Sequence, residues 1–332
     1  MKKKILKYSL LAVLVVLGSG FIYFFVGSAP YVENVAWGVN FSQKHALYLG
    51  LDWKETYLAI LDDLSARRIK IAAHWDLIET GNDSYFFDDL DWQVKEAEKR
   101  GAQVLMVIGM KTPRWPECHI PSWALGLSKK EAQREIMGML AVVVERYKNN
   151  PALLGWQVEN EPFFPFGECP WADASFLKEE VKQVKSLDPF HAIVITASGE
   201  GSFWTRAART GDKVGTTLYR KVWSTQLGTY FSYPFRPLFY WRKAQFIKAF
   251  FGKEVIGVEL QAEPWGQVLL YDLPLEEQEK TMNLERFKAV VEYAKNTGLR
   301  EQYFWGTEWW YWMKTKQNNP VIWDEAKTLF SL

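Results

Sequence analysis

Apolar and polar positions follow two alternating periods in the chain after residue 30. Short, continuous apolar runs are followed by longer stretches in which apolar residues recur every three or four positions, as in amphipathic helices. The apolar runs predict eight strands, at 35–41, 69–75, 103–109, 153–161, 192–197, 214–219, 254–259 and 301–305. The periodic stretches predict helices at 53–68, 88–100, 129–148, 176–187, 203–210, 284–297 and 324–332, and an aromatic insertion, 230–241, leads into one more helix that ends near residue 251.

Strands that alternate with helices of this length indicate an α/β fold with a parallel sheet. Eight strand–helix units form the number that closes a (β/α)8 TIM barrel, so we expect a single barrel domain over residues 30–332. The alternative is an open, doubly wound sheet. That fold usually has a glycine-rich phosphate loop after its first strand, and the segment from Gly38 to Phe41 contains no such motif.

Residues 1–28 form a separate segment. A basic cluster, Met1 to Lys4, precedes an uncharged and largely apolar run of 19 residues from Tyr8 to Val26. This run is close to the roughly 20 residues that span a bilayer, and it exceeds the apolar region of most cleaved signal peptides. We therefore expect a transmembrane signal anchor with the barrel outside the cytoplasm. Cleavage near Gly27 would instead give a secreted protein.

The composition excludes some classes of function. With 40 basic and 39 acidic residues, the net charge of +1 gives no electrostatic case for binding nucleic acid. The four histidines are scattered and no Cys-x-x-Cys pair occurs, so neither a metal nor another cofactor is expected. Nothing points to an obligate protein partner. The 17 tryptophans exceed what a core requires and suggest flat apolar surfaces in a carbohydrate-binding cleft.

The two cysteines, Cys118 and Cys169, fall in loops after neighbouring predicted strands. Export would permit a disulfide between them. The alternative is two inert thiols.

Two glutamates end predicted strands on opposite sides of the barrel. The fourth strand ends in Asn160-Glu161-Pro162, and the seventh ends at Glu259, 98 residues later, or about three βα units. A charge at the end of an apolar strand is costly unless it has partners or a function. Two carboxyl groups across a tryptophan-lined cleft are the apparatus of glycoside hydrolysis, in which burial and mutual repulsion separate their pKa values.

Other side chains at the carboxyl ends of the strands are candidates for substrate binding, although each could also serve only in packing: His74, Trp75, Trp115, Tyr219 and Trp305. Lys111 and Arg114 are expected to be solvated.

These motifs resemble clan A of the glycoside hydrolases, which are (β/α)8 barrels that hydrolyse β-linked sugars with retention. The resemblance rests on Asn-Glu-Pro at strand four together with Glu at strand seven. Further segments are similar to the β-galactosidase and β-xylosidase branches, so that it covers residues 36–312: Trp75 to Glu79, Tyr85 to Asp91, Thr112 to Trp115 and Val258 to Gln261.

The resemblance implies a role for each matching residue. Glu161 would be the general acid/base and Glu259 the nucleophile. Asn160 would bind the substrate 2-hydroxyl, Tyr219 would hydrogen-bond the nucleophile, and Trp305 would support the sugar ring. Two positions depart from the pattern. Lys70 stands where many members have an arginine beside the nucleophile, and Glu263, four residues after Glu259, is an alternative nucleophile.

The sequence therefore predicts a membrane-anchored, retaining β-glycosidase with a carbohydrate substrate. One alternative is a catalytically inactive carbohydrate-binding barrel at the cell surface, against which the presence of both glutamates argues. Another is a barrel metallohydrolase, which requires a His-x-His pair on the first strand that this chain does not have.

Overall fold

The computed structural model describes residues 2–331, except for the side chains of residues 2–7 and 16. Met1 of the predicted basic cluster and Leu332 of the predicted last helix lie outside the described residues, as do the side chains of the cluster's lysines.

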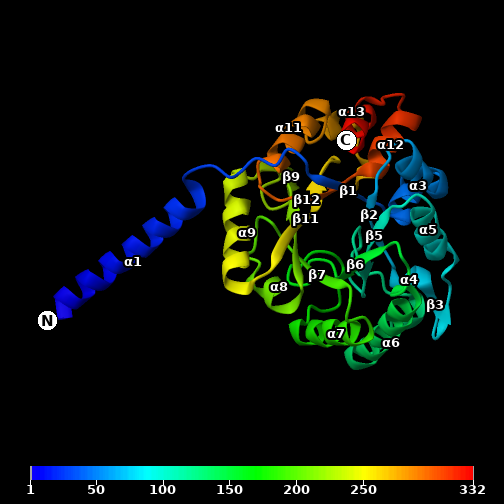
Figure 1. Ribbon diagram of the computed structural model, residues 1–332, viewed down its shortest axis with the longest axis horizontal. Helices are drawn as coiled ribbons and strands as arrows, with labels where there is room; N and C mark the ends of the chain where they lie inside the picture. The colour runs from blue at the N-terminus through cyan, green and yellow to red at the C-terminus, as the bar shows by residue number, and fades with distance from the viewer. Residues whose placement is uncertain (1, 332) are drawn as a thin grey trace.

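Eight parallel strands form a closed barrel, as predicted, in the order β1-β12-β11-β8-β7-β6-β5-β2 (Figure 1). The barrel strands are β1 (Ala36–Asn40), β2 (Arg68–Ala72), β5 (Gln103–Ile108), β6 (Leu153–Val158), β7 (Ala192–Ala197), β8 (Lys213–Leu218), β11 (Glu254–Gln261) and β12 (Glu301–Trp305). Most of their residues are buried, as expected for strands that pack on both faces.

The barrel closes where the first strand meets the last. Ala36 of β1 pairs with Glu301 of β12, and Val39 pairs with Ile69 of β2 on the other side. The Asn40 amide then donates hydrogen bonds to two carbonyl oxygens across the barrel end, those of Val258 (3.0 Å) and Phe304 (2.9 Å). Asn40 therefore braces three strands at the end where the active site of such a barrel lies.

Helices surround the barrel (Figure 1). They are α2 (Gln43–Tyr48), α3 (Trp53–Asp62), α4 (Trp75–Ile78), α5 (Asp88–Lys99), α6 (Lys129–Tyr147), α7 (Ala174–Leu187), α8 (Thr205–Thr210), α9 (Pro237–Phe251), α10 (Leu275–Glu279), α11 (Leu284–Lys295), α12 (Thr307–Lys316) and α13 (Val321–Phe330). Two short 3-10 helices cover Ser122–Ala124 and Leu270–Asp272. Two hairpins pair β3 (Glu79–Gly81) with β4 (Ser84–Tyr85) and β9 (Lys221–Ser224) with β10 (Thr229–Ser232).

Several element ends differ from the predictions. The helix predicted over 53–68 ends at Asp62, because the chain turns at Ser65, which has a positive φ of 62°. The strand predicted over 153–161 ends at Val158, because Glu159 and Glu161 also have positive φ values. The short helices α2 and α12 were not predicted. Both pack against α3 and against each other.

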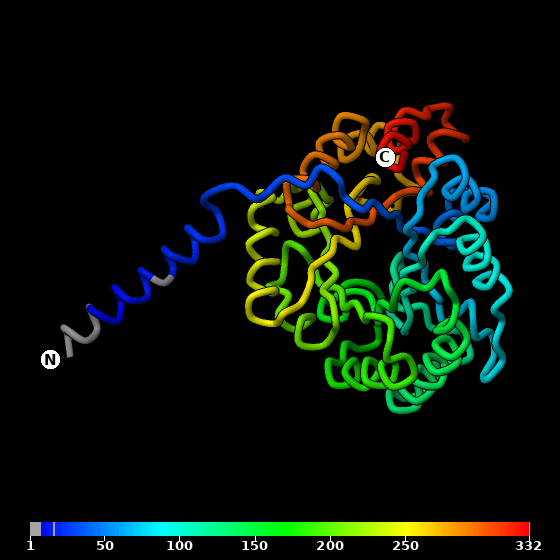
Figure 2. The backbone as a smooth tube through the Cα atoms, in the orientation of Figure 1, coloured from blue at the N-terminus to red at the C-terminus, as the bar shows by residue number. Residues whose placement is uncertain are grey.

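Helix α1 (Lys2–Phe25) leads away from the barrel (Figure 2). Its segment Tyr8–Phe25 is long and apolar enough to cross a membrane, a test that a signal sequence also passes. Its last turn contacts the barrel domain: the Phe25 ring stacks on Phe239 of α9 with centroids 5.6 Å apart, and Phe24 meets Phe203 edge-on.

Candidate active site

Glu161 lies at a sharp turn of the backbone beyond β6. Glu159 and Glu161 have φ values of 58° and 41°, a left-handed conformation that is uncommon outside glycine and recurs at functional sites. The Glu161 amide donates to Thr196 Oγ1 of β7 (2.7 Å), and Thr217 Oγ1 of β8 donates to Glu161 Oε1 (3.3 Å). The turn therefore directs the buried carboxyl group across β7 towards β8.

Glu259 lies at an irregularity of β11. The pairing of β11 with β8 changes register between Gly257 and Glu259, and such bulges re-aim side chains. Lys70 Nζ of β2 lies 3.2 Å from Glu259 Oε1, and the Tyr219 hydroxyl donates to Oε2 over 3.0 Å. Each oxygen of the carboxylate therefore has its own hydrogen-bond donor, and the expected contact with Tyr219 is present.

The two glutamates differ in their electrostatic surroundings. Burial raises the pKa of Glu161 well above its usual range, and the charges of Glu259 and Glu117 act in the same direction. Glu259 instead faces a lysine. Burial lowers the pKa of this lysine, Lys70. The negative charge of Glu259 acts in the opposite direction, but the effect of burial is larger. The surroundings thus favour a protonated carboxyl at Glu161, whereas the Glu259 carboxyl group has a donor at each oxygen.

Glu263, the alternative nucleophile, is held by other partners. It forms an ion pair with Arg114, and His45 Nε2 lies 3.4 Å from its Oε2. Burial opposes its charge, but these two partners outweigh that effect and lower the pKa of Glu263 to about 2. Glu263 is thus held by Arg114 and His45, whereas Glu259 is held by Lys70 and Tyr219.

The prediction that Lys111 and Arg114 are solvated is wrong. Both are buried in the loop after β5. Lys111 Nζ donates to the carbonyl oxygens of Glu161 (3.3 Å) and Phe164 (2.8 Å), and so fixes the loop after β6. Arg114 pairs with Glu263 and also with Glu308, at 3.1 Å.

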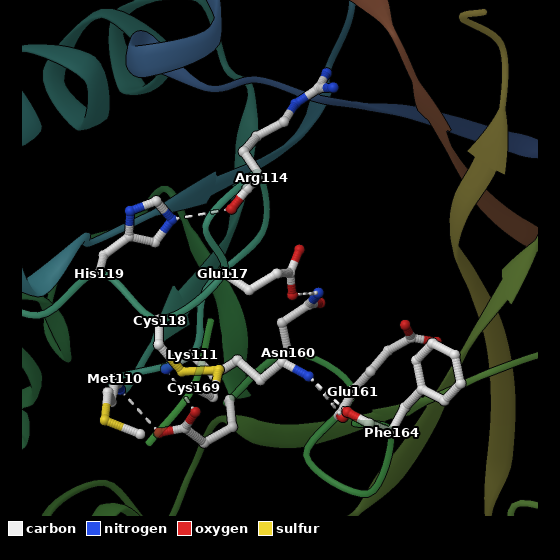
Figure 3. Close-up of a disulfide and its surroundings, with 11 residues drawn as sticks. Met110, Lys111, Arg114, Glu117, Cys118, His119, Asn160, Glu161, Phe164 and Cys169 are labelled. Carbon is white, nitrogen blue, oxygen red and sulfur yellow. Dashed lines mark hydrogen bonds between the residues drawn. A yellow bond between two sulfur atoms is a disulfide. The ribbon is translucent and has the colours of Figure 1, made fainter. Parts of the chain in front are cut away.

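A disulfide joins Cys118 to Cys169, with their Cα atoms 5.2 Å apart, so the disulfide alternative is confirmed and the two thiols are excluded (Figure 3). It ties the loop after β5 to the loop after β6. Glu117, the residue before Cys118, is thereby held beside the end of β6, where its Oε2 accepts a hydrogen bond from Asn160 Nδ2 at 3.0 Å (Figure 3).

Asn160 is held at both ends of its amide. Its Nδ2 donates to Glu117, and its Oδ1 accepts from Gln157 Nε2 at 3.0 Å. The orientation of the Asn160 amide is therefore set before any substrate binds.

Two predicted substrate-binding residues are buried and engaged in other contacts. Trp75 is fully buried in the core, where its indole packs edge-on against Trp123 and donates to Glu79 Oε2 at 2.6 Å. It has no surface left for a sugar, so its predicted role in binding is wrong. His74 is also buried; its Nδ1 lies 2.7 Å from Thr112 Oγ1, and burial lowers its pKa well below the usual value. Its contacts are those of a residue that supports the loop after β5.

The predicted aromatic surfaces differ in accessibility. One face of Trp305 is covered by Arg114, whose guanidinium carbon lies 4.0 Å from the ring centre, and the side chain is only 6% exposed. Trp115 is 41% exposed at the rim. From it a row of ring contacts leads through Phe166 and Trp265 to Tyr219, with centroids 6.1, 6.1 and 5.2 Å apart. This row provides the aromatic surface beside the carboxyl groups.

The sequence analysis missed Glu117 as a site residue and left the role of Lys70 open. Lys70 is 189 residues from Glu259, and the barrel closure brings the two together. The available signal for Glu117 was its neighbour in the sequence, Cys118. Cys169 follows soon after Glu161, so a disulfide between Cys118 and Cys169 places Glu117 at the site. Among residues 2–331, no group of three or more His, Cys, Asp or Glu side chains is arranged to hold a metal ion.

No family model matches the chain. Two fungal proteins match part of it: the mannan endo-1,4-β-mannosidase F of Aspergillus fumigatus, 28% identical over 134 residues, and a probable enzyme of the same name from Emericella nidulans, 28% identical over 135. Each match covers 37% of this chain, and less than a third of the relative: 29% and 30%.

Solved structures share the fold over most of the chain. A β-galactosidase from Rahnella sp. R3 matches with a TM-score of 0.56 and 13% identity, over 92% of this chain and 57% of that one. A GH5_18 protein from Streptomyces cattleya in complex with GlcNAc matches at 0.57 and 13%, over 84% and 71%. The exo-β-1,4-mannosidase Op5Man5 from an Opitutaceae bacterium matches at 0.57 and 11%, over 84% and 54%.

Proposed function

We propose that this chain, a clan A glycoside hydrolase by its barrel and its sequence matches, is a retaining β-glycosidase with Glu161 as general acid/base and Glu259 as nucleophile. The observation that carries the proposal is the contrast between the two carboxyl groups. Glu259 faces the donors Lys70 and Tyr219, whereas Glu161 is buried beside other carboxyl groups that raise its pKa. One group is thus suited to attack and the other to give up a proton.

The reaction follows in two steps. Glu259 attacks the anomeric carbon while Glu161 gives its proton to the leaving oxygen, which forms a covalent glycosyl-enzyme. Glu161, now ionised, then takes a proton from water, whose oxygen attacks the anomeric carbon and releases the sugar and Glu259. Lys70 and Tyr219 hold the Glu259 carboxylate in position in both steps, and the proposed chemistry uses no cofactor.

β-Mannosides are the first substrates to test, because both curated sequence relatives are named as mannan endo-1,4-β-mannosidases. β-Galactosides and β-xylosides come next, since enzymes named for these activities share the fold. We place the reaction outside the cytoplasm, with α1 as a membrane anchor or a cleaved signal, and the Cys118–Cys169 disulfide fits an oxidising compartment.

The test is an assay of the full chain in detergent on aryl β-glycosides, beside the variants Glu161→Ala and Glu259→Ala. We expect activity in the wild type and a loss of at least about 1,000-fold in Glu259→Ala, since the nucleophile is missing. Glu263→Ala is the matched control. Equal rates of hydrolysis by the wild type and by both catalytic variants would rule out the proposed glycosidase activity.

A mechanism-based 2-fluoroglycoside identifies the nucleophile directly. The fluorine slows both steps, and a reactive leaving group lets the covalent intermediate accumulate. Peptide mass spectrometry should then find the label on Glu259. A label on Glu263 would overturn the assignment, and sugar binding without hydrolysis would instead favour an inactive carbohydrate-binding barrel.

A further inference from the structure

Glu117 is a third buried carboxyl group at the site, and the proposed two-step reaction leaves it without a role. Its Oε2 accepts the hydrogen bond from Asn160 Nδ2, whereas its Oε1 makes no hydrogen bond to any residue in the described range, 2–331. The side chain is 5% exposed, so this oxygen is reached by water or by a bound molecule rather than by a protein group. Glu117 therefore has one oxygen available to a bound molecule.

The backbone holds Glu117 firmly in this position. The Glu117 amide donates to the Arg114 carbonyl (2.7 Å), and its own carbonyl accepts from the Thr112 amide (2.8 Å). Its φ of 72° lies in the left-handed region, and the next residue, Cys118, is bonded to Cys169 (Figure 3). A side chain anchored in this way is positioned in advance of substrate, as recognition requires.

Glu117 lies near both catalytic carboxyl groups. Burial raises the pKa of Glu117 to about 8. The charge of Glu259 adds to this effect, whereas the Asn160 hydrogen bond and the charges of Lys111 and Lys70 oppose it. Glu117 in turn raises the pKa of Glu161. The anomeric carbon has to lie between Glu161 and Glu259, so Glu117, bonded to the neighbouring Asn160, faces the part of the sugar ring beside that carbon.

We propose that Glu117 is a specificity-determining residue whose carboxyl group binds, together with Asn160, the hydroxyl on carbon 2 of the sugar that is cleaved. This inference rests on the proposed glycosidase function and deepens it. Below pH 8 the carboxyl group is neutral and both donates and accepts a hydrogen bond. The enzyme then distinguishes sugars that differ at carbon 2 through a residue of the loop after β5.

The test uses the full-length enzyme with Glu117→Ala and Glu117→Gln. Glu79→Gln is the matched control, because Glu79 is also a buried carboxyl group with a raised pKa, and its hydrogen bonds come from Trp75 and Asp83 rather than from Asn160. The substrates are an aryl β-mannoside, the aryl β-glucoside that is its epimer at carbon 2, and the matching 2-deoxy glycoside. The measurements are kcat and KM for each substrate from pH 5 to 9.

We expect Glu117→Ala to lower kcat/KM by about 10- to 100-fold for its preferred 2-hydroxyl substrate, and by less than about 3-fold for the 2-deoxy glycoside. In the wild type, kcat/KM for the 2-hydroxyl substrate divided by kcat/KM for the 2-deoxy glycoside should change as pH passes through about 8. In Glu117→Gln the same ratio should not depend on pH. Ionisation of Glu161 affects both substrates alike and cancels in this ratio, so the pH test remains decisive even if the alanine variant does not fold.

Equal losses on both substrates, or a wild-type ratio that does not change with pH, would overturn the role of Glu117 while leaving the glycosidase intact. A wild type that hydrolyses none of the substrates would overturn the proposed function, and this inference with it.

Discussion

Lys70 Nζ lies 3.2 Å from Glu259 Oε1, and both side chains are almost completely buried. The lysine comes from β2 and the glutamate from β11, so their contact exists only in the closed barrel. A buried ion pair of this kind is costly to break from one side, because the remaining charge has no partner and no water.

Lys70→Met should therefore lower both activity and stability. We expect kcat/KM to fall by at least about 100-fold and the free energy of unfolding to fall by about 3–5 kcal/mol, since Glu259 is left as an unpaired buried charge. Steady-state kinetics and urea unfolding measure the two effects. Lys70→Arg is the control that keeps the charge, and it should retain more activity than Lys70→Met; an equal loss would mean that charge is not the reason.

The effect of Glu161→Gln should depend on the leaving group. A good leaving group, such as a dinitrophenolate, departs without a proton, whereas an alkoxide requires one. We expect the loss of kcat/KM to be at least about 100-fold greater for a poor leaving group than for a good one. Kinetics on a series of aryl and alkyl glycosides would check this, and a uniform loss would contradict the acid role of Glu161.

Glu117 should make the protein less stable as pH rises. The unfolded chain loses this proton near the ordinary glutamate pKa, about 4.5, whereas the folded state holds it up to about 8. Between these values the folded state binds more protons, so stability is present below pH 4.5 and is lost towards pH 8, by up to about 1.4 kcal/mol per pH unit. Urea unfolding at pH 5 and 7.5 should show Glu117→Gln gaining stability relative to the wild type at the higher pH. A constant difference would contradict this.

Reduction of the Cys118–Cys169 disulfide should destabilise the protein. The bond closes a loop with a sequence separation of 51 residues, for which chain entropy corresponds to about 4 kcal/mol. We expect dithiothreitol to lower the unfolding temperature and the activity, because Glu117 is adjacent to the bond. The double variant Cys118→Ser, Cys169→Ser is the control, and dithiothreitol should change neither its unfolding temperature nor its activity.

Helix α1 should hold the protein in the membrane. Its exposed apolar segment, Tyr8–Phe25, predicts that the full chain stays with the membrane after carbonate extraction, whereas a chain beginning at residue 30 is released. The mass of the mature protein gives the alternative outcome: an N-terminus near Ser28 would mean cleavage and secretion.

The sequence was sufficient for the barrel and for the placement of Glu161 and Glu259 at the ends of its strands, because both depend on local patterns. Strands buried on both faces are continuous apolar runs, and their order gives the end at which Glu161 and Glu259 lie. The pairing of Tyr219 with Glu259 followed from the resemblance to a family rather than from any spacing in the chain.

The remaining features depend on contacts that no local pattern contains. In the sequence Arg114 is an ordinary polar loop residue, but Glu263 and Glu308, 149 and 194 residues later, hold it in the interior over Trp305. Trp75 was assigned to the cleft because it follows a strand, yet the chain turns into α4 there and buries the indole. Loop conformation, rather than strand order, decides these positions.

The pairing of β1 with β12 also has a consequence for how the chain assembles during synthesis. One edge of β1 has no partner until Glu301–Trp305, the last of the eight barrel strands in chain order, has been made. Since an open strand edge invites wrong pairing, the nascent chain is vulnerable until β12 has been made. A premature stop anywhere before Glu301 would leave that edge permanently open, so even a fragment that retains Glu161 and Glu259 should aggregate rather than persist as a smaller enzyme.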